Sequence, residues 1–124
     1  MIIAIDFDGT CVTHAFPTVG KDIGAARILR ALTEKKHQLI LYTMRDRDTL
    51  KDAINWFAEN NIPLYAVNNN PSQRKWTKSP KVFAHLYIDD AALGTPLKFD
   101  ENISDRPFVN WEKVEQLLKE KEII

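Results

Sequence analysis

Short apolar runs that alternate with helical patterns constrain the fold of this chain more than any other feature of its sequence. The runs are continuous and rich in Ile, Leu, Tyr and Val, as expected of strands that are buried in a parallel sheet. They cover Ile2–Ile5, Leu39–Tyr42, Leu64–Val67 and Leu86–Ile88. Apolar residues at i, i+3, i+4 and i+7 predict helices between these runs, through Ala25–Leu32 and Leu50–Phe57. Asp46 or Asp48 is expected to cap the second of these helices.

Strands that alternate with helices favour an α/β fold. We therefore expect a Rossmann-like three-layer α/β/α sandwich around a central, mainly parallel sheet. The 124 residues fit one domain, residues 1–124. A last amphipathic helix is predicted from Asn110 onwards, whereas the polar segment 68–80 is predicted to be a loop or one short turn.

The charge balance argues against a polyanionic partner. Lys plus Arg and Asp plus Glu both number 17, so no net field attracts a nucleic acid or an anionic membrane surface. No apolar stretch reaches the length of a membrane span. Cys11 is the only cysteine, so no intramolecular disulfide forms, and the reducing cytoplasm is the expected compartment.

Polar residues follow each predicted strand at the point where it ends. In chain order they are Asp6 and Asp8, then Thr43 and Arg45, then Asn68 to Asn70, and last Asp89 and Asp90. The carboxyl ends of parallel strands meet at one edge, where α/β proteins bind ligands. Carboxylates gathered there repel one another unless a cation joins them, and oxygen ligands with room for water suit Mg²⁺. The alternative is that the acids merely cap helices or turns.

Three short motifs carry a resemblance to a known family. DFDGT at Asp6–Thr10, LILYTMR at Leu39–Arg45 and YIDD at Tyr87–Asp90 resemble motifs I, II and IV of the haloacid dehalogenase superfamily. Their order also fits, and the short segments between them resemble the small capless members. The resemblance implies a haloacid dehalogenase-like fold and a Mg²⁺-dependent phosphatase that hydrolyses a phosphate monoester through an aspartyl-phosphate intermediate.

The resemblance also implies a role for each matching residue. Asp6 would attack phosphorus, Asp8 would serve as general acid and then general base, and Thr43 would hydrogen-bond a phosphoryl oxygen. The Mg²⁺ ligands would be Asp6, Asp89, Asp90 and, through its backbone carbonyl, Asp8. Gly9 and Thr10 would let the chain turn away beneath the phosphate. An acid at the second position favours phosphoryl transfer over dehalogenation, since an alkoxide leaving group needs a proton and a halide does not.

The basic residue of motif III is open among Lys75, Lys78 and Lys81. The stretch SPKVFAHLYIDD resembles the short versions of this motif and favours Lys81. Lys81 stands about five residues before the last strand and must span roughly 16 Å, which requires a nearly extended connection. Lys78 is separated from the last strand by more residues, so its connection need not be fully extended.

A capless site is open to solvent, which suits a large substrate, a small phosphate ester or a cap donated by a second subunit of a homo-oligomer. A small-molecule ester such as a nucleotide or a sugar phosphate is the expected partner. His14, Arg45 and Lys78 are candidate substrate contacts. For His14 the alternative is an ordinary surface turn, and for Arg45 it is a surface salt bridge.

Two other functions are compatible with an acidic site on a small α/β domain. A receiver-like signalling module accepts a phosphoryl group on an aspartate after its third strand, but here the third strand is followed by asparagines at 68–70. A catalytically silent phosphate-binding protein is the other alternative. Residues for every predicted role in motifs I, II and IV are present, which disfavours it.

Overall fold

The computed structural model describes all 124 residues and places four parallel strands in one sheet, in the order β3-β2-β1-β4. The strands are β1 (Ile2–Ile5), β2 (Gln38–Leu41), β3 (Ala66–Val67) and β4 (Leu86–Ile88). The central strand β1 pairs along its length with β2 and from Ile3 to Ile5 with β4. The mainly parallel α/β sheet that the apolar runs predict is therefore confirmed.

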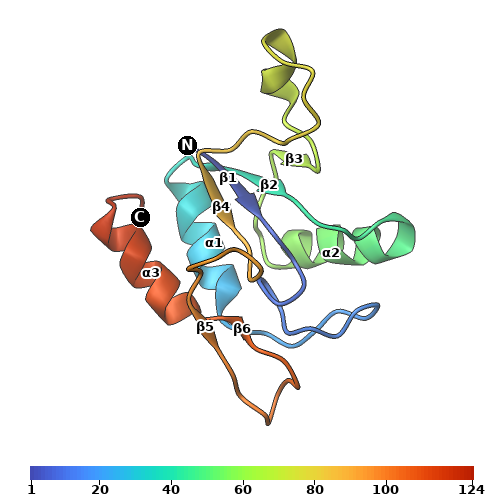
Figure 1. The fold of residues 1–124 in the computed structure, drawn as a ribbon, viewed down its shortest axis with the longest axis vertical. Helices are drawn as coiled ribbons and strands as arrows, with labels where there is room; N and C mark the ends of the chain where they lie inside the picture. The colour runs from blue at the N-terminus through green and yellow to red at the C-terminus, as the bar shows by residue number, and fades with distance from the viewer.

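Three α-helices follow the predicted patterns. They are α1 (Ala25–Glu34), α2 (Arg47–Glu59) and α3 (Trp111–Glu120), and Figure 1 shows α1 between the other two. The apolar stripe of α1, from Ala25 to Leu32, is buried as expected. Asp46 occupies the N-cap position of α2, and the Asn110 side chain caps α3 by accepting a hydrogen bond from the Lys113 backbone N–H.

All three helices cover the same face of the sheet. Alternate strand residues, among them Ile3, Ile5, Leu39 and Leu41, share one hydrophobic core with the buried residues of α1, α2 and α3. Right-handed crossovers explain this placement, because the chain moves in one direction from β1 to β2 to β3.

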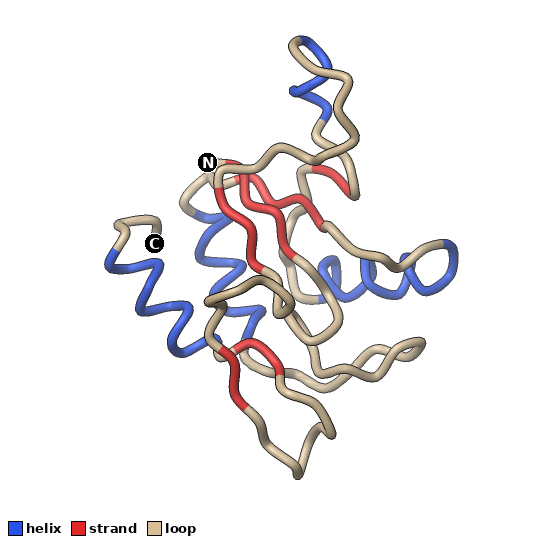
Figure 2. The backbone as a smooth tube through the Cα atoms, viewed as in Figure 1, coloured by secondary structure: helices blue, strands red, loops and turns tan.

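The opposite face of the sheet has little cover. The buried apolar residues outside the main core are Ala4, Ile40, Val82 and Ala84, so a short loop packs on the sheet there. The connection from β3 to β4 has no α-helix, and its only helical part is the 3₁₀-helix η1 (Pro71–Lys75) (Figure 2). The third layer of the predicted sandwich is therefore not confirmed.

The segment between β3 and β4 is held by polar contacts. The Gln73 side chain donates to the carbonyls of Ser79 and Lys81 and accepts from the Phe83 N–H, while Asn70 donates to the Phe83 carbonyl. The part around η1 projects beyond β3 (Figure 1). Its single short turn agrees with the sequence prediction for this region.

A hairpin that the sequence analysis did not predict precedes α3. It consists of β5 (Leu97–Lys98) and β6 (Phe108–Val109), which pair antiparallel. Each strand has only two residues, too few for an alternating pattern to stand out.

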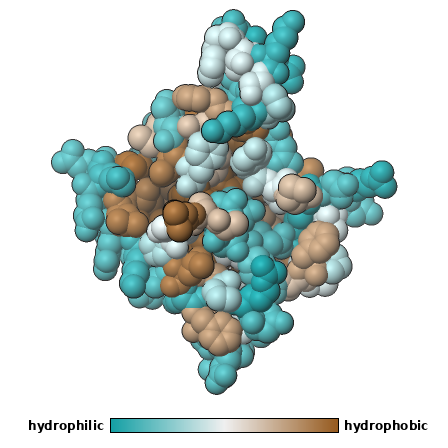
Figure 3. Space-filling model, viewed as in Figure 1, coloured by the Kyte–Doolittle hydropathy of each residue, from teal (hydrophilic) through white to brown (hydrophobic).

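Apolar residues also reach the surface. Figure 3 shows hydrophobic residues gathered where α3 lies beside the edge strand β4, and a groove there is lined by Leu86, Ile88, Leu93 and Leu117 among others. None of the helices combines the length with the hydrophobicity that a membrane span requires.

Candidate active site

The carboxyl ends of β1 and β4 bring three acidic side chains together. Asp6 follows β1, and the pair Asp89-Asp90 follows β4, its neighbour in the sheet. One carboxylate oxygen from each of these residues lies within 4.8 Å of the other two. We call this cluster the acidic triad. The convergence expected from the sequence is seen for these three acids, and three hard oxygen donors fit a cation such as Mg²⁺.

Thr10 joins the two sides of the acidic triad. Its hydroxyl donates a hydrogen bond to Asp6 Oδ2 at 2.7 Å and accepts one from the Asp90 backbone N–H at 3.0 Å. The side chain is fully buried. The sequence predicts only a turn at Gly9-Thr10, because nothing in the sequence shows which strand end the Thr10 hydroxyl contacts.

The chain after β1 is anchored by the elements near the C-terminus. Gly9 has a φ of 77°, in the left-handed region that favours glycine, and its carbonyl accepts from the Val109 N–H at 2.9 Å. The buried Trp111 indole donates to the Thr10 carbonyl at 2.7 Å. The unpredicted strand β6 and the start of α3 therefore hold the loop that carries Asp6 and Asp8.

Unless a cation is bound nearby, the surroundings of Asp6 favour its protonated form over its carboxylate. The pKa of its carboxyl is raised from 3.8 to about 8, and burial is the largest cause. The hydrogen bond from Thr10 opposes this shift, whereas the charge of Asp89 and the contact and charge of Asp90 add to it. A divalent cation among these oxygens would remove the penalty, so the residues present fit a metal site.

Cys11 lies behind the acidic triad as a structural residue. Its Sγ is 3.3 Å from the Asp6 carbonyl, and the side chain is fully buried. Burial raises the pKa of the thiol well above its usual value, and the charges of Asp6 and Asp8 raise it further. A thiol kept protonated in this way is a poor nucleophile.

Asp8 stands apart from the acidic triad and pairs with Arg45. The guanidinium donates from Nε to Asp8 Oδ2 and from Nη2 to Asp8 Oδ1, both at 2.8 Å. This bidentate pair is nearly closed to solvent on the arginine side, where the side chain is 1% exposed. The Asp8 side chain is thus oriented by Arg45, and the metal role predicted for Asp8 concerns its backbone carbonyl only.

Arg45 ties three segments of the site together. Besides Asp8, its guanidinium donates to the carbonyls of Pro17, Thr18 and Thr49, and it lies between the rings of Phe7 and Phe16 at 5.0 and 5.2 Å. Its N–H groups point at protein acceptors. Of the two expectations for Arg45, the structure therefore shows an ion pair, although it is buried rather than on the surface.

His14 reaches the acidic triad from the segment after β1. Its Nε2 lies 2.8 Å from Asp90 Oδ2, and the imidazole side chain is 15% exposed. The expected substrate contact of His14 stays a prediction, because the contact seen here is to a candidate metal ligand.

Thr43 and Arg45 both follow β2, and they are linked. The Thr43 N–H donates to Asn68 Oδ1 at 2.8 Å, and the Thr43 hydroxyl oxygen accepts from the Arg45 N–H at 3.1 Å. The hydroxyl proton has no acceptor in the protein, so it remains available for an oxygen of a ligand.

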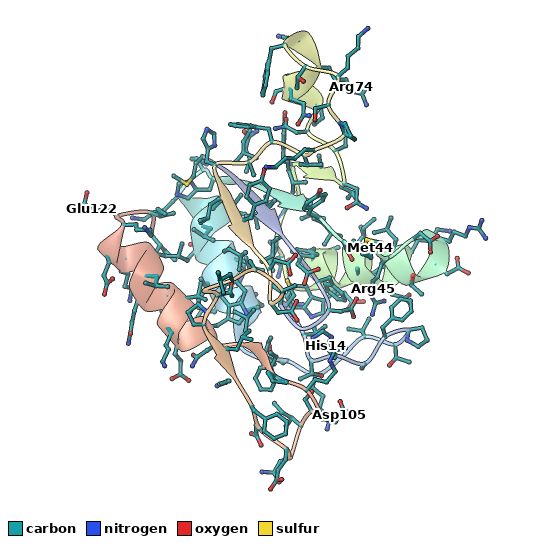
Figure 4. All side chains as sticks on the ribbon, in the orientation of Figure 1. His14, Met44, Arg45, Arg74, Asp105 and Glu122 are labelled. Carbon is teal, nitrogen blue, oxygen red and sulfur yellow. The ribbon has the colours of Figure 1, made fainter.

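The lysine of motif III is the least defined part of the site. Lys75, Lys78 and Lys81 are all exposed, and none of their ammonium groups lies within the 4.0 Å of a carboxylate that defines an ion pair. Lys78 lines a polar cleft together with Arg74, which projects far from His14 and Arg45 in Figure 4. The choice among the three lysines stays a prediction.

The search of solved structures finds one protein that resembles the whole chain. It is a conserved protein from Bacteroides thetaiotaomicron, with a TM-score of 0.77 and 34% sequence identity over 98% of this chain and 91% of that chain. A scan against protein-family models and a search of curated proteins find no match.

Proposed function

The chain belongs to the same family as the conserved Bacteroides thetaiotaomicron protein, and from its site we propose that it is a Mg²⁺-dependent phosphatase of the haloacid dehalogenase type. The proposal includes the haloacid dehalogenase-like form of the Rossmann-like fold. It is supported by the sheet order β3-β2-β1-β4, with acids after the neighbouring strands β1 and β4.

The acidic triad is the observation that carries the proposal. Three carboxylates from two strand ends lie within 4.8 Å, and one of them has a raised pKa because it is buried among the others. Such a cluster is costly unless it serves a cation. Mg²⁺ bound there would neutralise the repulsion between a carboxylate nucleophile and a phosphate dianion.

Asp6 is the proposed nucleophile. Its carboxylate oxygen forms a bond to phosphorus while the bond from phosphorus to the ester oxygen breaks, which leaves an aspartyl phosphate and an alcohol. Water then attacks phosphorus, releases inorganic phosphate and restores the carboxylate. Thr10 holds Asp6 Oδ2 by a hydrogen bond, so Oδ1 is the oxygen that we assign to attack.

Asp8 is the proposed proton carrier for both steps. It gives a proton to the leaving ester oxygen and takes one from the attacking water. Each of its oxygens accepts one hydrogen bond from Arg45 and keeps a second lone pair for substrate or water. The Thr43 hydroxyl, whose proton has no acceptor in the protein, is the proposed donor to a phosphoryl oxygen.

A panel of phosphate esters with and without Mg²⁺ tests this function. Wild-type protein should release phosphate from at least one ester only with Mg²⁺, and Asp6→Asn should lower turnover by at least about a thousandfold. Asp105→Asn, a change in the exposed loop between β5 and β6, is the matched control and should retain activity.

Two outcomes would contradict the proposal. Stable phosphorylation of the protein by acetyl phosphate, without release of phosphate, would favour a receiver-like module. Turnover that survives both EDTA and Asp6→Asn would show that neither the metal nor this carboxylate carries the reaction.

A further inference from the structure

The sparsely covered face of the sheet contains a hollow that opens onto Asp6. Its lining includes Ala4, Asp6, Tyr42, Tyr87 and Asp89, and its volume is about 230 Å³. Two of these residues belong to the acidic triad, so the hollow is continuous with the candidate active site.

Strand register explains why these residues share one surface. Ala4 lies opposite Tyr87 of β4 and opposite Ile40 of β2. Hydrogen bonds from the Tyr42 N–H to the Ile5 carbonyl and from the Asp6 N–H to the Ile88 carbonyl continue this register by one step. Side chains two residues apart point to the same face, so Asp6 lies between Tyr42 and Asp89, one row beyond Ala4.

Tyr42 and Tyr87 line the hollow from the strands on either side of β1, and each residue is 38% exposed. Tyr87 is fixed, because its hydroxyl donates to the Val82 carbonyl at 2.6 Å and accepts from the Ala84 N–H at 3.1 Å. The Tyr42 hydroxyl has no hydrogen-bond partner in the protein. Ala4 lies on β1 between these strands, and its small, buried side chain leaves space in the hollow.

We propose that the substrate is a phosphate monoester whose organic group carries a single planar aromatic ring, held over Ala4 between Tyr42 and Tyr87. The inference rests on the proposed phosphatase function and names its substrate class. With the phosphate at Asp6, a ring one or two bonds from the ester oxygen reaches the row of Ala4, since residues two apart on a strand are separated by about 7 Å.

The chemistry of the lining supports this class over others. Aromatic side chains favour another ring by offset or edge-to-face contact. The lining contains no Lys or Arg, so the hollow does not suit a second anionic group of the substrate. Its volume is below the roughly 300–1,000 Å³ of pockets for drug-sized ligands, which fits one ring rather than a larger group.

Binding of two phosphonates, which are not hydrolysed, tests the ring site by calorimetry with Mg²⁺ present. Benzylphosphonate, whose ring lies one bond from the carbon that replaces the ester oxygen, should bind wild-type protein about threefold to tenfold more tightly than methylphosphonate, the range expected for an aromatic contact. Tyr42→Ala removes one of the two aromatic rings, and Ala4→Val fills the space between them. Each substitution should abolish the difference in affinity and leave methylphosphonate binding unchanged. Phe99→Ala, an exposed ring outside the hollow, is the control.

Turnover separates this inference from the proposed function. Methyl phosphate and benzyl phosphate differ mainly in the ring, which in benzyl phosphate lies two bonds from the ester oxygen, and wild-type protein should show a lower KM for the second. Equal kcat/KM values, or equal phosphonate affinities, would overturn the ring site while Mg²⁺-dependent turnover upheld the phosphatase. Absence of both phosphonate binding and turnover of any ester would overturn the two together.

Discussion

Replacing Asp6 with asparagine should stabilise the metal-free protein, and the gain should be larger at pH 8 than at pH 5. The folded-state pKa of Asp6 is raised from 3.8 to about 8, first by burial and then by Asp89 and Asp90. Between these two values the folded protein holds a proton that the unfolded chain has lost. The free energy of unfolding therefore falls as the pH rises from about 4 to about 8.

The size of the effect follows from the shift. Each pKa unit corresponds to about 1.4 kcal/mol, so the three pH units from 5 to 8 set a ceiling of about 4 kcal/mol. The site opens to solvent, and counter-ions and side-chain adjustment reduce the penalty. We expect Asp6→Asn to gain about 2 kcal/mol more at pH 8 than at pH 5. Asparagine keeps an oxygen for the Thr10 hydrogen bond, so little else should change.

Urea unfolding in EDTA at both pH values measures this difference, with Trp111 in the core as a fluorescent reporter. Asp105→Asn, which removes an exposed carboxylate, should give no pH-dependent gain. Mg²⁺ at 100 times its Kd for the wild-type protein should raise the free energy of unfolding of that protein by about 2.7 kcal/mol at pH 8. The same Mg²⁺ concentration should raise that of Asp6→Asn by less. An equal gain at both pH values, or a loss at pH 8, would refute the electrostatic account of the acidic triad.

Three substitutions test the supports of the site. Arg45→Ala should cost about 3–5 kcal/mol in urea unfolding, because it leaves Asp8 without its buried partner; a loss below about 1 kcal/mol would contradict the buried pair. Trp111→Phe removes the N–H that the Thr10 carbonyl accepts and should cost about 1–3 kcal/mol by the same assay, together with a lower kcat. Gly9→Ala places a carbon against the side chains of His14 and Asp90 at a positive φ, so calorimetry should show Mg²⁺ affinity reduced by about fivefold to thirtyfold, the equivalent of the 1–2 kcal/mol backbone penalty.

The predictions from the sequence succeeded where one local pattern decides the structure. The apolar runs at 2–5 and 86–88 are strands, and the stripe from Ala25 to Leu32 is the buried side of α1. Asp46, one of the two N-cap residues that the sequence predicts for α2, occupies the N-cap position of that helix. In each case a few adjacent residues supply the whole signal.

The third layer of the predicted sandwich is not confirmed, and the sequence of one segment explains why. The segment from 68 to 80 lacks helical periodicity, yet the usual α/β pattern places a helix between parallel strands. In the structure this segment contains no α-helix, and η1 is its only helical part. The absence of an amphipathic pattern in a segment is therefore better evidence that no helical layer forms there than the usual architecture of α/β proteins is evidence that one does.

The candidate site also has one part that the sequence predicts and another part that it does not. The convergence of Asp6, Asp89 and Asp90 follows from strand ends in a parallel sheet, which the sequence can show. The pairing of Asp8 with Arg45 depends on how the loop after β1 folds back on the start of α2, and neither pattern nor spacing encodes that contact. The motif III lysine stays open for a related reason, since its segment is positioned by side-chain hydrogen bonds.

The missing helix links the stability of the fold to its function. A helix between β3 and β4 would cover Ala4 and the two tyrosines and would close the face onto which Asp6 opens. Without it, that face keeps only a small apolar core, and the loop from Lys81 to Ala84 is held by Gln73 and the Tyr87 hydroxyl. Tyr87 therefore has two roles. Its hydroxyl holds the loop that covers part of this face, whereas its ring lines the hollow that the loop leaves open. A chain that fastened this loop through a larger apolar core would be more stable, but it would fill the space in which we place the substrate.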